Sequence, residues 1–194
     1  MKDFEQKIKD SINSSIQTKL SLLELCLNSI EETGLILSKC IKNGGKILFC
    51  GNGGSAADSQ HLAAELVIRY RSTFNRPAIP GIALTVDPSI MTAGGNDIGF
   101  ENVFARGVEA YGQPEDVLVG ISTSGNSENV LRAAKKAKEI GMKVVGLLGC
   151  GGGKIAEICD ISVIVPSDIT ARIQESHILI GHIWCEIIEE YNFE

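Results

Sequence analysis

Short apolar runs alternate with longer amphipathic stretches along most of this chain. Five of the runs have the length and uniform apolar character of buried parallel strands, and they lie at 46–50, 82–86, 117–121, 143–148 and 161–165. Hydrophobic positions with a helical period lie between and after them, at about 55–69, 100–111, 127–140, 153–158 and 170–191. This alternation predicts an α/β fold, a doubly wound five-stranded parallel sheet flanked by helices, with right-handed crossovers.

A long helical pattern also precedes the first expected strand, over residues 3–42. Its wide apolar face is formed by Leu20, Leu23, Ile30, Leu35 and Leu37. This face is larger than a helix pair on the outside of a small sheet can bury. We therefore expect the long N-terminal helices (residues 1–42) to pack against other subunits in a closed homo-oligomer, a D₂ tetramer. The sequence has no linker and no internal repeat, so residues 1–194 are expected to form one domain.

The composition is that of an ordinary globular protein, with 44% hydrophobic and 22% charged residues. The net charge of −6 argues against a general surface for nucleic acid or anionic membranes, which needs a basic face. The charged first residues, and the lack of an apolar run near the roughly 20 residues of a membrane span, predict a cytoplasmic protein without a membrane partner. Six scattered cysteines without a C-x-x-C pair fit a reducing compartment.

A glycine-rich loop, GNGGSAAD, follows the first expected strand and opens a helix. It is not a P-loop, because no Gly-Lys-Ser/Thr ends it. Gly51, Gly53 and Ala56 fit the loose dinucleotide pattern G-x-G-x-x-G/A. However, the acidic residue that reads the ribose is missing from the end of the second strand, and Asp87 lies too far along.

A simpler interpretation of this loop is that Gly53 and Gly54 let the backbone approach a small ligand, beside the amide of Asn52. Ser55 is expected to N-cap the following helix, with Asp58 completing a variant of the capping box. The loop thus predicts a ligand contact and a helix start in the same few residues.

A serine-rich loop, STSGNSEN, follows the third expected strand and opens the next helix. Around Gly125 it places four hydroxyls, those of Ser122, Thr123, Ser124 and Ser127. Hydroxyls beside the free N–H groups of a helix start form a phosphate site that needs no positive charge. Any one of these residues could belong to a solvated turn, but together they favour phosphate binding.

The helix after the glycine loop carries His61 and Glu65 one turn apart, on one face, a spacing that suits a metal site or proton transfer. The last expected helix carries the other two histidines, His177 and His182, together with Gln174. Gln174 and His182 are separated by about 12 Å along the helix and roughly 80° around it. They would meet on one metal only with difficulty, unless a neighbouring subunit supplies one of them. Spacing alone does not choose between the two histidines, and His177 could support the site or lie in an interface.

Four segments together resemble the sugar isomerase (SIS) domain family: GNGGSAADSQHLAAEL, GGNDIGFENVF, GISTSGNSENVL and ARIQESHILIGH. They stand in the family's order, and the resemblance covers essentially the whole chain. It implies a SIS fold and an aldose–ketose isomerase. The activity implied is conversion of sedoheptulose 7-phosphate to D-glycero-D-manno-heptose 7-phosphate, an early step in ADP-heptose synthesis for lipopolysaccharide or another surface polysaccharide.

The resemblance also implies the site residues. The serine-rich loop takes the phosphate, and the substrate contacts are Asn52, Gly53, Gly54, Ser55, Glu65, Asn96, Asp97, Ser122, Thr123, Ser124, Ser127 and Gln174. One zinc ion per subunit is implied, with the ligands His61, Glu65, Gln174 and His182. A homotetramer with active sites between its subunits is implied as well.

Such an isomerase moves a proton between adjacent carbons and protons between their oxygens, so it needs a base, an acid and stabilisation of the enediolate. We assign Glu65 as the base on carbon and His182 as its acid–base partner. If both residues bind zinc tightly, neither is free for proton transfer. The metal is then either labile and partly structural, or a Lewis acid on the substrate oxygens while one ligand shifts.

Two other functions fit parts of the sequence. Some SIS relatives of this length are non-catalytic and bind partner proteins such as a replication initiator, and others are sugar-phosphate sensors. Both kinds keep the fold and the glycine-rich loop, but an interaction module does not need Glu65 and His182 together. Dinucleotide binding is disfavoured by the missing ribose-reading acid.

Overall fold

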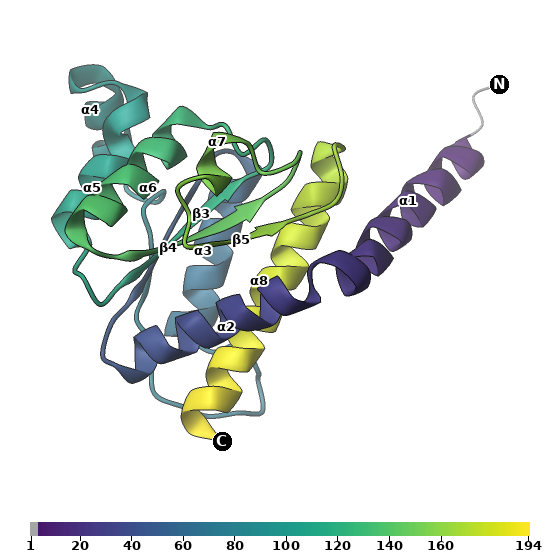
Figure 1. Ribbon diagram of the computed structural model, residues 1–194, viewed down its shortest axis with the longest axis horizontal. Coiled ribbons are helices and arrows are strands. Elements are labelled where there is room, and N and C mark those ends of the chain that lie inside the picture. Colours follow the sequence, from purple (N-terminus) through teal and green to yellow (C-terminus); the bar gives the residue numbers. More distant parts are fainter. Residues whose placement is uncertain (1–3) are drawn as a thin grey trace.

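The computed structural model of the protein describes residues 4–194 (Figure 1). Residues 1–3 of the expected N-terminal segment lie outside the described residues. The strands are β1 (Ile47–Gly51), β2 (Gly81–Ala83), β3 (Val117–Ser122), β4 (Lys143–Leu148) and β5 (Ile161–Ile164). The helices are α1 (Phe4–Leu25), α2 (Leu27–Lys42), α3 (Gly54–Val67), α4 (Pro88–Asp97), α5 (Val103–Tyr111), α6 (Glu128–Ile140), α7 (Gly153–Ala156) and α8 (Thr170–Phe193), with a 3₁₀ turn, η1 (Phe100–Asn102), before α5.

All five strands pair in parallel, in the order β2-β1-β3-β4-β5. This confirms the predicted doubly wound sheet. The strand order reverses its direction between β1 and β3, so the crossovers from these two strands leave towards opposite edges. In such sheets the crevice at the reversal point, outside the carboxyl ends of the strands, is where ligands bind. The glycine-rich loop follows β1 and the serine-rich loop follows β3, so both predicted binding loops lie at this point.

Helices cover both faces of the sheet, as Figure 1 shows. Along each strand, alternate side chains enter opposite layers. Ile47 and Phe49 of β1 join the core formed with α2, α3 and α8, whereas Leu48 and Cys50 join the core formed with α5, α6 and α7. Burial on both faces explains why the strands are uniformly apolar rather than alternating.

The N-terminal end of α3 differs from the prediction. The helix begins at Gly54, with Gly53 as its N-cap at φ 55°, and the expected cap by the Ser55 hydroxyl is not formed. Because the chain turns sharply out of β1, the turn needs the positive φ that glycine tolerates. Ser55 therefore falls inside the first helical turn, where it is buried against Gly51. The prediction that Ser55 and Asp58 form a capping box was wrong.

Helix α4 was not predicted. Its start has clear signals, since the Asp87 carboxylate accepts hydrogen bonds from the N–H groups of Ser89 and Ile90, and Pro88 occupies the first turn. Two glycines in the helix, Gly94 and Gly95, hide the pattern. Strand β2 is also shorter than the predicted run 82–86, because pairing with β1 ends at Ala83.

Helices α3 and α8 pack closely at Gly181, where an added Cβ would lie 2.5 Å from a methyl carbon of Leu62. On its other side, α8 is joined to α2 by the indole N–H of Trp184, which donates to the carbonyl of Ile30 at 3.0 Å. Helix α8 is therefore held between α2 and α3, and its side chains next to Gly181 face α3.

The predicted N-terminal helical segment breaks at Cys26 into two helices with different surroundings. Helix α2 packs within the chain, through residues such as Leu37. Helix α1 extends away from the layered body (Figure 1). Its exposed large hydrophobic side chains are Phe4, Ile8, Ile12, Ile16, Leu20, Leu23 and Leu25. Within residues 4–194, none of the helices combines the length and the apolar character required to cross a membrane.

Candidate active site

The two loops at the carboxyl ends of β1 and β3 are tied together by a reciprocal pair of amides. Asn52 and Asn129 each donate from Nδ2 to the other's Oδ1 at 2.8 Å. Asn129 lies in the first turn of α6 and is buried, and its Oδ1 also accepts from the N–H of Val130 at 3.0 Å. Asn52, a predicted sugar contact, is thus held in place by Asn129, a residue for which the sequence predicted no role.

The serine-rich loop is fixed from two sides. Within the loop, the hydroxyls of Ser122 and Ser127 lie 3.0 Å apart, and Ser124 Oγ accepts from the N–H of Asn126 at 3.2 Å. From outside, the loop after β4 packs against it so closely that a Cβ on Gly125 would lie 2.0 Å from the carbonyl oxygen of Gly152. The hydroxyls and N–H groups at the start of α6 are therefore preorganised, as an anion site requires.

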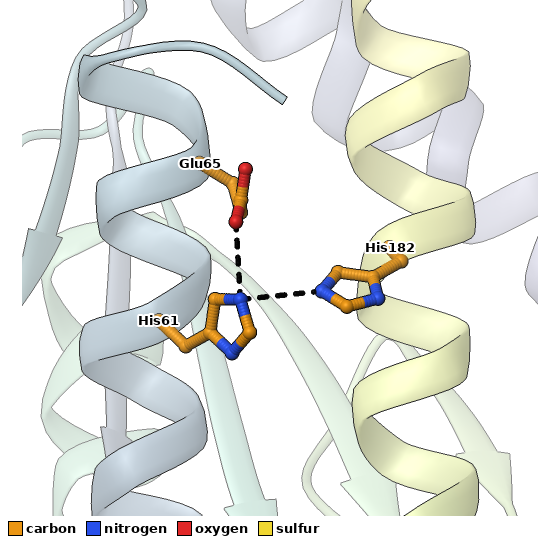
Figure 2. Close-up of side chains that lie close together, drawn as sticks. All are labelled: His61, Glu65 and His182. Carbon is orange, nitrogen blue, oxygen red and sulfur yellow. Dashed lines mark hydrogen bonds and ion pairs between the residues drawn. The ribbon is translucent and has the colours of Figure 1, made fainter. Parts of the chain in front are cut away.

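Three proposed ligands from two helices converge on one another (Figure 2). His61 Nε2 lies 3.0 Å from Glu65 Oε1, and His182 Nε2 lies 3.4 Å from His61 Nε2. One ligand atom of each residue lies within 4.8 Å of the other two. The i, i+4 spacing on α3 presents His61 and Glu65 together, and α8 brings His182 to them across 121 residues of sequence.

The donor atoms of this group are ones that could hold a metal ion. An imidazole Nε2 carries at most one proton, so His61 cannot donate to Glu65 and to His182 at the same time. Partial burial lowers the pKa of His182, and the neighbouring His61 lowers it further, so its imidazole is neutral at pH 7. Two imidazole nitrogens and a carboxylate oxygen thus face one another, and these are ligand types that zinc accepts.

Two neighbours of this group were not predicted. The ring of Tyr70 lies over His182, with ring centroids 5.5 Å apart. Asp58 lies one turn before His61 on α3, and burial raises the pKa of its carboxyl to about 6, against the lowering effect of His61. The i−3 spacing of Asp58 from His61 was available in the sequence. The approach of Tyr70 to His182 was not, because it depends on the loop that follows α3.

The remaining predicted site residues lie elsewhere in the chain. Gln174 is on α8 next to the start of α3, where a Cβ on Gly54 would lie 2.5 Å from its Nε2. It therefore faces the glycine-rich loop, about 10 Å along α3 from His61 at 1.5 Å per residue. Asn96 and Asp97 end α4 and are exposed, with Asn96 Nδ2 donating to Asp97 Oδ1 at 2.7 Å. Among residues 4–194, no hydrogen bond joins either of them to the two loops or to His61.

His177 has a structural position instead. It is fully buried, and its Nε2 donates to the carbonyl of Leu148, at the end of β4, at 3.1 Å. A carbonyl only accepts, so the proton is on Nε2, and Nδ1 has no partner within the described chain. Burial lowers the pKa of His177 to about 4, despite the opposing effect of this hydrogen bond. The structure thus distinguishes the two histidines that sequence spacing could not.

Comparisons with known proteins identify relatives of this chain. The sequence profile of the SIS domain family matches residues 12–149. Phosphoheptose isomerase 1 of Campylobacter jejuni is 59% identical over 167 residues, which cover 86% of this chain and 89% of that protein. Phosphoheptose isomerase of Clostridium acetobutylicum is 51% identical over 100% of this chain and 97% of its own length. The solved structure of phosphoheptose isomerase from Neisseria gonorrhoeae superimposes with a TM-score of 0.91 at 43% identity, covering 97% of this chain and 100% of that one.

The Asn52–Asn129 pair predicts that a change at Asn129, which is not itself a predicted substrate contact, weakens substrate binding. Asn129→Ala removes both bonds to Asn52, so the glycine-rich loop loses its fixed position and the KM for a phosphorylated sugar should rise about tenfold, the equivalent of about 1.4 kcal/mol. Steady-state kinetics measures this effect. Asn192→Ala is the matched control, since it removes an amide bonded to the carbonyls of Ser38 and Ile188 far from the loops. Equal KM values in the two variants would contradict a role for the pair.

The buried His177 predicts a pH dependence of stability. Its pKa is about 4 when folded, against an ordinary value of 6.5. As the pH falls, His177 is therefore protonated first in the unfolded chain. The contribution of His177 to the free energy of unfolding is fully present above pH 6.5, and about 3 kcal/mol of it is lost as the pH falls towards 4. Urea unfolding at fixed protein concentration should show this loss in the wild type and a flatter dependence in His177→Gln. Parallel curves for the two proteins would show that His177 does not carry the effect.

Proposed function

The chain belongs to the SIS domain family and within it to the phosphoheptose isomerases, and from this membership we propose that it converts sedoheptulose 7-phosphate to D-glycero-D-manno-heptose 7-phosphate. The observation that carries the proposal is the convergence of His61, Glu65 and His182 from α3 and α8, α3 being the helix that the glycine-rich loop opens at the reversal point of the sheet. These parts supply what an aldose–ketose isomerase needs, namely an anchor for the phosphate and groups that move protons.

The serine-rich loop is proposed to hold the phosphate, through the hydroxyls of Ser122, Thr123, Ser124 and Ser127. They lie at the start of α6, where free N–H groups and the helix dipole favour an anion. This suits a protein with a net charge of −6, because the attraction is local and needs no basic surface. Asn52, Gly53, Gly54 and Ser55 are proposed to contact the sugar.

Glu65 is proposed to abstract the proton from the carbon next to the carbonyl, and to return it to the neighbouring carbon. His182, neutral through burial, is proposed to move protons between the two oxygens of the enediolate. The two groups reach the site from different helices, so each can lie on its own side of the sugar chain.

The same residues fit a zinc ion. His61, Glu65 and His182 would hold it, and the metal would supply electrostatic stabilisation of the substrate oxygens. We propose Gln174 as a fourth ligand only if a neighbouring subunit provides it, because within the chain it lies against Gly54. Asn96 and Asp97 are proposed to contact the substrate bound to a neighbouring subunit, because both are exposed at the end of α4.

We also propose a homotetramer, with α1 at its centre. In the described part of the N-terminal segment, every exposed large hydrophobic side chain except Leu27 lies on α1. We propose that the protein acts in the cytoplasm, where its six free cysteines would stay reduced. Its proposed role is to supply a heptose phosphate for lipopolysaccharide or another surface polysaccharide. A non-catalytic interaction module or a sensor is disfavoured, because neither requires His61, Glu65 and His182 to converge.

Replacing the proposed base tests the function. The wild type should convert sedoheptulose 7-phosphate, as followed by NMR of the sugar with and without a chelator. Glu65→Gln keeps the size of the side chain but removes its basicity, so turnover should fall about 10²–10⁴-fold while the protein still folds and binds substrate. Proton exchange between solvent and the substrate carbon should be lost in this variant and can survive in His182→Asn. Glu190→Gln, at an exposed site on α8, is the control. Wild-type turnover in Glu65→Gln would refute the mechanism.

The assembly is tested by placing a charge on the α1 stripe. Ile12→Glu should dissociate the tetramer at micromolar concentration, because a carboxylate would be buried in an apolar interface. Gln17→Glu introduces the same side chain on another face of α1 and should leave the assembly intact. Sedimentation velocity distinguishes the species. A monodisperse wild-type monomer would overturn the proposed assembly.

A further inference from the structure

A second polar network joins the segment after α3 to α8, outside the group of His61, Glu65 and His182. Its centre is the carboxylate of Glu189 on α8, whose side chain is 0% exposed. This carboxylate accepts hydrogen bonds from Nε of Arg76 at 2.8 Å, from Nε of Arg71 at 3.0 Å and from the N–H of Tyr70 at 3.1 Å. Burial alone would raise the pKa of Glu189, but these donors outweigh it and hold the pKa below its ordinary value. Glu189 is therefore charged and fully paired.

Arg76 extends this network to the helix that carries the proposed base. Its side chain is 1% exposed. Nη2 donates to the backbone carbonyl of Glu65 and Nη1 to that of Leu66, both at 2.8 Å. These carbonyls lie in the last turn of α3, where the helix offers no partner of its own. One guanidinium thus binds the backbone of Glu65 and a carboxylate of α8 at the same time.

The network also reaches the other side of the site. Glu189 follows His182 by seven residues, about two helical turns, so both face α3. The N–H that Glu189 accepts belongs to Tyr70, whose ring lies over His182. The position of Glu65 relative to His182 is therefore determined at two levels, by the packing at Gly181 and by the Arg76–Glu189 pair beyond it.

We propose that Arg76 is a positioning residue for the isomerisation, which fixes the backbone of Glu65 relative to α8 and so the separation of the two proton-transfer groups. This rests on the proposed function of Glu65 and His182. Arg76 contacts neither side chain of that pair, and it acts through the carbonyl of Glu65. The alternative is that the Arg76–Glu189 pair only stabilises the fold. Buried ion pairs often add little net stability, so burial by itself does not indicate that role. The hydrogen bond to the Glu65 carbonyl distinguishes Arg76 from Arg71, which binds the same carboxylate and donates no hydrogen bond to α3.

The two arginines provide a matched experiment. Arg76→Lys keeps the charge but cannot reach Glu189 and both carbonyls at once, because an ammonium lacks the planar fork of guanidinium. We expect kcat to fall at least about tenfold with KM within about twofold, since a misplacement of about 1 Å can cost about 10²-fold in rate. Arg71→Lys makes the same change at the arginine that is not hydrogen-bonded to α3, and should leave kcat and KM unchanged. Independently of turnover, the ring ¹⁵N signals of His61 and His182 should shift in Arg76→Lys and not in Arg71→Lys.

Two results would overturn the proposal: wild-type kcat and unshifted ring signals in Arg76→Lys, or equal losses in both variants, which would assign the effect to Glu189 as a whole. Should Arg76→Lys fail to assemble, Arg76→Met combined with Glu189→Leu removes both charges of the buried pair, and Arg71 keeps its ion pair with Glu194. The folded double variant should also lose kcat with KM retained, and wild-type kcat in it would equally refute the proposal. A wild type that does not turn over sedoheptulose 7-phosphate would refute the proposed function, while the ring signals would still test the positioning.

Discussion

The candidate site depends on how closely α3 approaches α8. His61 and Glu65 belong to one helix and His182 to the other, and only the absence of a side chain at Gly181 lets the helices come near enough for the two imidazoles to lie 3.4 Å apart. The same packing buries Leu62 in the core beneath the site. A rigid apolar contact thus determines the distance between the polar groups. Their arrangement is unfavourable by itself, because two imidazole nitrogens and a carboxylate oxygen face one another with too few protons to form all the hydrogen bonds.

A second constraint comes from the strand order. Because the sheet reverses between β1 and β3, the glycine-rich and serine-rich loops leave adjacent strands and diverge, which opens the crevice between them. The amide pair of Asn52 and Asn129 bridges that divergence. The loops are held by hydrogen bonds and close backbone contacts rather than by charge, so an acidic protein can present a local site for an anion. Preorganised donors of this kind need no rearrangement when the ligand binds.

Three features of the described chain have no explanation within the candidate site of one subunit. The apolar stripe of α1 is exposed, and none of the ten residues of α4 is buried, including Asn96 and Asp97 at its end. Gln174 likewise lies against the glycine-rich loop rather than beside His182. A site shared between subunits would give all three an explanation, because it would cover α1 and could bring side chains from one subunit to the loops of another.

The sequence by itself determined the fold class and the positions of the two candidate binding loops. Periodicity places five buried strands and their helices, because burial on both faces leaves a continuous apolar run, and the loops at 51–58 and 122–129 are visible because glycine and hydroxyl residues interrupt that pattern. The prediction from the sequence pattern failed at two places. At the start of α3, Gly53 takes the N-cap position that was expected for Ser55, and at α4 two glycines masked a helix. Residue spacing did not distinguish His177 from His182, and the family resemblance alone favoured His182; the tertiary structure supplied the physical reason, because it buries His177 against the carbonyl of Leu148. The tertiary structure alone revealed Asn129, Tyr70 and Arg76. Their roles come from contacts between residues far apart in the chain, and a one-dimensional pattern records which face of a helix is apolar but not which other helix will pack there.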